Sequence, residues 1–92
     1  MHSPLTQNAV MILRAIYELT NKDGDECTPA QIHDFYKGKM ENYLIHKNLK
    51  VLEGRHLLSC KREVTAHGGS KPSYYFTSTR EALEEILKTL ET

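Results

Sequence analysis

The sequence predicts a small α+β fold in which three helices precede a β-hairpin and a fourth helix follows it. Apolar residues recur at three- and four-residue steps near both ends of the chain, a spacing that places them on one face of a helix. The segment Thr-Pro-Ala-Gln at 28–31 has the composition of a helix start. In residues 57–78, polar and apolar side chains first alternate, a glycine-containing turn follows, and an aromatic run comes last. This is the pattern of the two strands of a hairpin.

Length and composition indicate one domain over residues 1–92, since single domains most often have roughly 100 to 150 residues. Twelve Lys and Arg balance twelve Asp and Glu, and 39% of the residues are hydrophobic, which is ordinary globular composition. No apolar run approaches the ~20 residues of a membrane helix, and no basic leader precedes an apolar stretch. Two cysteines without a CxxC pair fit a reducing compartment. We therefore expect a cytoplasmic protein without a membrane partner.

The first helix is expected over residues 5–20. Its apolar positions share one face: Leu5, Ala9, Ile12, Leu13, Ile16 and Leu19. The run NKDGDE then ends it, because Asn, Asp and Gly prefer turns to helix interiors. A short strand is expected at 26–28.

The second and third helices form a helix-turn-helix. Thr28 is the expected N-cap, Pro29 suits the first helical position and Gln31 completes a T-x-x-Q capping box. Ile32, Phe35 and Tyr36 would face inward. Lys37 and Gly38 form a short connection, and the third helix spans 40–53 until Gly54 supplies a left-handed stop.

A hairpin and a last helix complete the chain, with strands at 57–64 and 73–78 and a turn-forming tip at 65–72. Strand side chains alternate between two faces, so at least one of Tyr74, Tyr75 and Phe76 must point to the core, and we favour core packing over stacking on nucleic-acid bases. Ser78 and Glu81 have capping-box spacing. The last helix, ending near Glu91, carries an apolar stripe of Leu83, Ile86, Leu87 and Leu90.

This order of elements is that of a winged helix-turn-helix. The segment LKVLEGRHLLSCKREVTAHGGSKPSYYFTSTREALEEIL resembles the stretch from recognition helix through wing to final helix in small regulators of the MarR, PadR and ArsR type. Those read L-x-x-L-x-x-x-x-L-I, a basic glycine-containing wing tip and Y-x-L-T; the corresponding residues here are Leu49, Leu52, Leu57, Leu58, Gly68, Gly69, Tyr75, Phe76 and Thr77. Two departures are Asn48, which stands on an expected apolar face, and a final helix shorter than the PadR dimerising arm. The resemblance implies a DNA-binding winged helix over nearly the whole chain.

The neutral total charge conceals a basic middle. Between Lys37 and Pro72 there are eight basic residues against three acidic ones, a net charge of +5, so the remainder carries −5. On the helix at 40–53, Leu44, Ile45, Leu49, Val51 and Leu52 would cover the core half. The other half would carry Lys39, Asn42, Tyr43, His46, Lys47 and Lys50. Lys can meet phosphate or guanine and Asn can pair with adenine, so this half suits the major groove, whereas the alternative is an ordinary polar surface.

The hairpin is the second candidate contact with DNA. Lys61, Arg62, His67 and Lys71 lie on or beside its tip, where glycines allow close approach to the backbone or the minor groove. Arg55 and His56, just after the third helix, can reach a phosphate, and the alternative is that they are solvated turn residues. The alternative is a charged hairpin whose lysines only block edge pairing.

No metal site, cofactor or catalytic site is expected. Cys27, Cys60 and the five histidines show neither CxxC nor HxxxH spacing, and no GxSxG or P-loop motif occurs. We therefore expect a binding protein and no enzyme.

The terminal helices suggest a homodimer, because a domain this small buries only about 60 to 65% of its unfolded surface and a symmetric partner adds apolar burial. The alternative is that the two helices only close their own core. The sequence thus predicts a homodimeric repressor that binds double-stranded DNA sequence-specifically. The runner-up is a winged-helix adaptor for protein interaction, replication or segregation.

Overall fold

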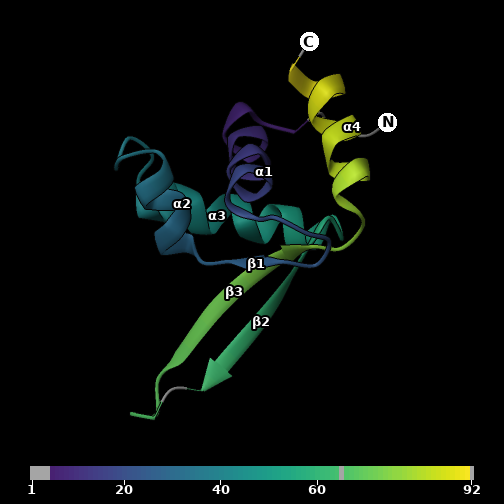
Figure 1. Cartoon of the computed structure of the whole chain (residues 1–92). Coiled ribbons are helices and arrows are strands. Elements are labelled where there is room, and N and C mark those ends of the chain that lie inside the picture. Colours follow the sequence, from purple (N-terminus) through teal and green to yellow (C-terminus); the bar gives the residue numbers. More distant parts are fainter. Residues whose placement is uncertain (1–4, 65, 92) are drawn as a thin grey trace.

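The computed structural model of the chain describes residues 5–64 and 66–91, and it has the element order expected from the sequence (Figure 1). In chain order the elements are α1 (Gln7–Leu19), β1 (Glu26–Cys27), α2 (Pro29–Phe35), α3 (Asn42–Gly54), β2 (Leu58–Val64), β3 (Ser70–Phe76) and α4 (Arg80–Glu91). The α+β arrangement is confirmed, and so is the short strand at 26–27.

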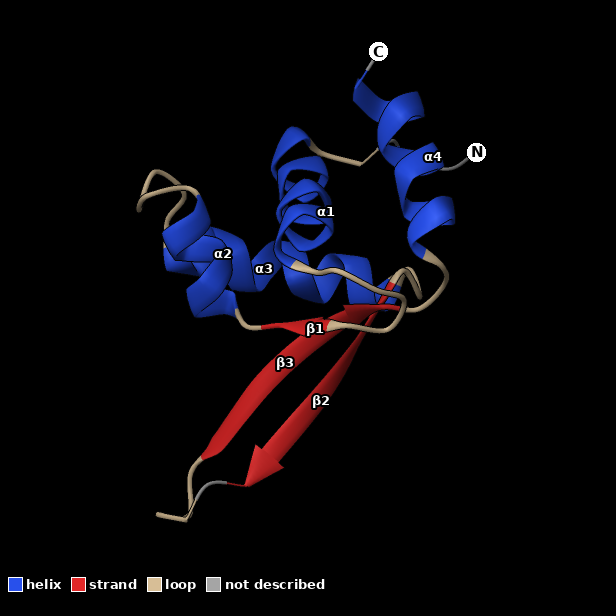
Figure 2. Cartoon of the chain, viewed as in Figure 1, coloured by secondary structure: helices blue, strands red, loops and turns tan. Residues whose placement is uncertain are grey.

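The three strands form an antiparallel sheet in the order β1-β3-β2. The hairpin pairs Leu58 with Phe76 at its base and runs to the end of both strands, whereas β1 pairs only with Tyr74 and Tyr75. Strand β3 begins at Ser70, three residues before the start at residue 73 that the sequence predicts, and so it includes Pro72. A proline is tolerated there because β1 does not reach it and that edge of β3 is open. Beyond β1 the hairpin leaves the helical body and projects from it (Figure 2).

The core lies where α1 packs against α2, α3 and α4 above the base of the sheet. The expected apolar face of α1 is confirmed, since Ile12, Leu13 and Ile16 are completely buried. Helix α4 contributes Leu83 and Leu87, while Leu90 near its end is 36% exposed. The chain's own terminal helices thus close the core of this molecule.

The helix ends differ from the sequence expectations in two places. Gly54 is the last residue of α3 and has no left-handed conformation; the left-handed residue is His56, with φ of 63°. The amides of His56 and Leu57 donate to the carbonyls of Glu53 and Leu52, which is the Schellman arrangement with histidine in the usual glycine place. At α4, the hydroxyl of Thr79 accepts from Ala82 N–H, so the expected Ser78 cap is wrong.

Two residues of α3 depart from the expected core half. Val51 is 41% exposed, because the buried line of the helix runs through Ile45, Leu49 and Leu52 and Val51 lies about 100° from it. Asn48 is buried, and its amide donates to Leu44 O at 2.8 Å while its Oδ1 accepts from the Thr6 hydroxyl at 3.2 Å. Both polar ends of Asn48 are satisfied, which explains how an amide fits an otherwise apolar face.

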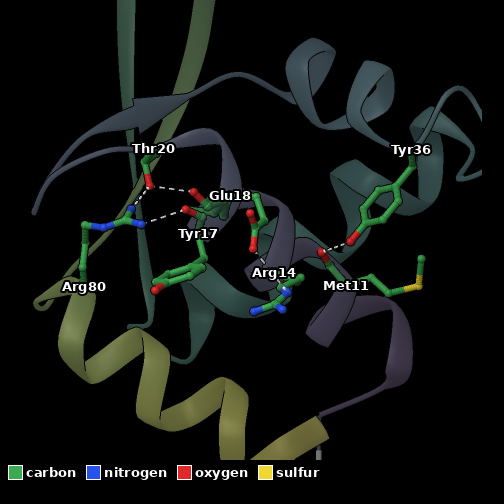
Figure 3. A network of polar contacts seen from close by, with 8 residues as sticks. Met11, Arg14, Tyr17, Glu18, Thr20, Tyr36 and Arg80 are labelled. Atoms are coloured by element: carbon green, nitrogen blue, oxygen red, sulfur yellow. Dashed lines mark hydrogen bonds and ion pairs between the residues drawn. The ribbon is translucent and has the colours of Figure 1, made fainter.

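Arg80 fastens α4 to the end of α1 (Figure 3). Its guanidinium donates to Thr20 Oγ1 at 2.6 Å and to Tyr17 O at 3.0 Å, and it lies 4.4 Å from the Tyr17 ring centroid. Its backbone N–H donates to Asp23 Oδ1 at 2.8 Å. A cation is favourable at this helix C-terminus, where carbonyls of the last turn lack amide partners.

Candidate nucleic-acid interface

Helix α3 presents a polar face to solvent. Tyr43 is 63% exposed, and the other expected contact residues on or just before the helix are exposed as well: Lys39, Asn42, His46, Lys47 and Lys50. Tyr43, Lys47 and Lys50 follow one another at i, i+4 and i+7 and so form the outward line of the helix. No acid occurs between residues 42 and 50. The face therefore combines hydrogen-bonding groups with positive charge.

The hairpin separates two neighbouring basic residues onto opposite faces. Arg62 is paired with Pro72 and shares the face of Cys60 and Leu58, which continues outward from the core. Lys61 is paired with Ser73 on the other face, and its Nζ lies 4.0 Å from a carboxylate oxygen of Glu26. Arg62 thus faces the same side as the helical body, whereas Lys61 faces away from it.

The remaining basic candidates lie at three different places. His67 is exposed at the tip, next to Gly68, whose φ of 81° requires the left-handed region that glycine tolerates best. Lys71 lies farther down β3, nearer the helices. Arg55 is exposed at the C-cap of α3, the end of that helix opposite Asn42.

A hollow of about 330 Å³ brings together residues from α2, α3 and β3. Its lining residues are Thr28, Pro29, Ala30, Asn42, His46, Lys71 and Pro72. The sequence analysis selected Asn42 and His46 of the third helix and Lys71 of the hairpin separately, and the fold brings them to one hollow. This proximity depends on how β3 is placed against α2 and α3, which no local sequence pattern gives.

The aromatic run of β3 serves the core, as expected. Tyr74 and Phe76 are 5% and 7% exposed, while Tyr75 between them is half-buried. Burial, together with the Cys60 thiol beside it, raises the pKa of Tyr74. Tyr74 and Phe76 are therefore packing residues of the core.

Both cysteines are free, and Cys27 is buried. Burial and the nearby Asp25 carboxylate raise the pKa of the Cys27 thiol to about 12, so it stays protonated and unreactive at neutral pH. Within residues 5–64 and 66–91, no three His, Cys, Asp or Glu side chains gather as a metal site would require. None of the helices described is long and apolar enough to cross a lipid bilayer.

Comparison with known proteins gives a structural likeness. No protein-family model matches the chain, and no curated protein matches it in sequence. Among solved structures, the fold is similar to that of a possible transcriptional regulator from Methanosarcina mazei Go1, with a TM-score of 0.68 at 13% identity. The likeness covers 94% of this chain and 67% of that protein. The chain therefore shares the fold of that protein. The likeness does not single out the MarR, PadR or ArsR type.

Proposed function

We propose that this chain is a winged helix-turn-helix protein that binds double-stranded DNA sequence-specifically. The observation that carries the proposal is the polar face of α3, which has no acid between residues 42 and 50 and is exposed beside a projecting basic hairpin. A helix of this composition fits the major groove, which admits one α-helix and displays a distinct pattern for each base pair. The likeness to a possible transcriptional regulator supports the same class of partner.

The residues of α3 would make different kinds of contact with DNA, according to their side chains. Asn42 has the amide that pairs with adenine, and Lys47 and Lys50 can reach guanine or phosphate. Tyr43 and His46 can donate to phosphate oxygens or base edges, and Lys39 precedes the helix close to the backbone.

The hairpin, acting as the wing, would lie on the DNA backbone or in the minor groove. Arg62, Lys71 and His67 are its proposed contacts, and Arg55 would meet a phosphate beyond the other end of α3. Lys61 is the weakest candidate, because its Nζ lies 4.0 Å from a carboxylate oxygen of Glu26. A charge already neutralised by a neighbouring acid attracts phosphate less.

We further propose a homodimeric repressor. The ends of α1 and α4 border a hollow of about 550 Å³, with lining residues Leu5, Gln7, Val10, Met11, Arg14, Tyr36 and Leu90. Leu83 and Leu87 already serve the core, so this remaining apolar surface is what a second copy would cover. The end of α4 and the hairpin tip lie at opposite ends of the molecule (Figure 1), which leaves the basic surface open in such a dimer. Two copies would read half-sites roughly 34 Å apart.

A salt series tests the proposal. Polarisation of a labelled random duplex, titrated at several salt concentrations, should give affinities that fall steeply as salt rises, because phosphate contacts release counterions. Selection from a random duplex pool should then enrich a palindrome. Affinity that is absent or insensitive to salt would favour the adaptor function, in which the basic face meets a protein.

A further inference from the structure

The hollow between α2, α3 and β3 is lined by basic, polar and apolar side chains. His46 and Asn42 line it from α3 and Lys71 from β3, and all three residues are exposed. Pro29 and Ala30 of α2 and Pro72 of β3 supply apolar surface. None of the lining residues that the structure describes is acidic, so this part of the hollow is electrostatically suited to an anion.

The start of α2 lines the hollow with Pro29 and Ala30 and offers few hydrogen-bond donors to a ligand there. The Thr28 N–H donates to Gln31 Oε1 at 2.8 Å, and the Thr28 hydroxyl accepts from Gln31 N–H at 3.2 Å. Pro29 has no N–H to give. The charged and polar side chains available to a ligand in the hollow come from α3 and β3, where His46 and Lys71 are 25 residues apart in the sequence.

The acid Glu26 pairs with a different lysine. Lys71 borders a smaller hollow lined by Glu26, and the Glu26 carboxylate lies 4.0 Å from Lys61 Nζ. A purely structural role for Lys71 would leave the affinity for DNA unchanged when the residue is replaced, so the test below separates this role from ligand binding.

We propose that this hollow seats one phosphate of the DNA backbone, held jointly by His46 and Lys71, and that the shared phosphate couples the recognition helix to the wing. The proposal rests on the DNA-binding function proposed above and adds a specific subsite to it. A volume of about 330 Å³ equals roughly eleven water molecules at ~30 Å³ each, which is ample for a phosphate and part of its sugar. Joint holding predicts that the contributions of His46 and Lys71 are coupled.

The test is a double-mutant cycle on a duplex selected by the wild-type protein. His46→Gln and Lys71→Gln should each weaken binding by about threefold to tenfold. The double variant should lose less than the product of the two single losses, because either change already weakens the same contact. Lys71→Arg should restore most of the affinity, and Lys88→Gln, at an exposed lysine of α4 that pairs with Glu84, is the control and should change it less than twofold.

A methylphosphonate scan of the same duplex identifies the phosphate. One backbone position should weaken wild-type binding when its charge is removed and should have no further effect on the His46→Gln/Lys71→Gln variant. Multiplicative losses, or the absence of any such position, would overturn the subsite while leaving DNA binding intact. Failure of the wild-type protein to bind any duplex would instead overturn the proposed function and the subsite with it.

Discussion

Arg80→Ala tests whether the junction between α1 and α4 is held as the structure indicates. The substitution removes the donors to Thr20 Oγ1 and Tyr17 O and the cation from the Tyr17 ring. Hydrogen bonds from a charged donor are worth about 1.5 to 3 kcal/mol each when buried, and cation–π contacts about 0.5 to 1 kcal/mol when exposed. The lower ends of these ranges sum to about 3.5 kcal/mol for the two hydrogen bonds and the ring contact. Arg80 is only half-buried, so we discount this sum for solvent screening and expect a loss of about 2 to 3 kcal/mol.

The assay is thermal unfolding followed by circular dichroism. For a domain of this length, 1 kcal/mol corresponds to about 4 to 8 °C, so the midpoint should fall by roughly 10 to 20 °C. Arg14→Ala is the matched control, because Arg14 approaches the same Tyr17 ring at 5.9 Å and pairs with Glu18 at 3.7 Å while its side chain is 44% exposed. It should cost less than about 0.5 kcal/mol. Equal destabilisation by the two changes would refute the assignment of Arg80 as the fastening residue.

Three further predictions follow from the fold and the interface. Arg62→Ala should weaken binding to all duplexes and lower the salt slope by about one unit, whereas Lys61→Ala should leave polarisation titrations nearly unchanged; equal effects would contradict the two-faced hairpin. Leu49→Ala should cost about 2 to 5 kcal/mol in denaturant unfolding, because Leu49 is completely buried between α3 and its neighbours. Leu90→Glu should give a monomer in sedimentation, and Val51→Glu, an equally exposed apolar site on α3, should leave the dimer intact.

The order of elements and the start of α2 are predictable from sequence because both depend on local chemistry. Thr28 and Gln31 form the reciprocal capping box that their spacing predicts. The alternation rule likewise predicts that the aromatic run of β3 packs inward, and Tyr74 and Phe76 do so. In each case the residues that decide the outcome lie within a few positions of one another.

The ends of α3 and α4 are harder to predict from sequence, because several neighbouring residues suit the same capping position. At α3, Gly54 is the residue that usually ends a helix, yet the helix continues through it and His56 takes the left-handed conformation. At α4, Ser78 and Thr79 are adjacent hydroxyl residues, and Asp23, 57 positions away, also accepts from the first helical amide. This second acceptor, the Asp23 carboxylate, comes from a loop that is distant in the sequence, so no local pattern predicts it.

The candidate site was predictable by residue type and unpredictable by placement. The exposure of the polar half of α3 follows from its periodicity, although the apolar side is narrower than the pattern indicates and leaves Val51 in solvent. Alternation puts Lys61 and Arg62 on opposite faces of the hairpin, but which of the two faces the helical body depends on strand register, which the sequence of the hairpin leaves open. The proximity of His46 and Lys71 depends on how β3 is placed against α2 and α3.

Discrimination between a selected duplex and a random duplex tests the central claim most directly. We would measure both affinities by polarisation for the wild type, for Asn42→Ala/Lys47→Ala and for Lys88→Ala, a basic residue on α4 remote from the proposed interface. The wild type and Lys88→Ala should prefer the selected duplex, and the α3 variant should lose about 1 to 3 kcal/mol of that preference for each base contact removed. A wild type without preference, or an α3 variant that keeps it, would contradict the account.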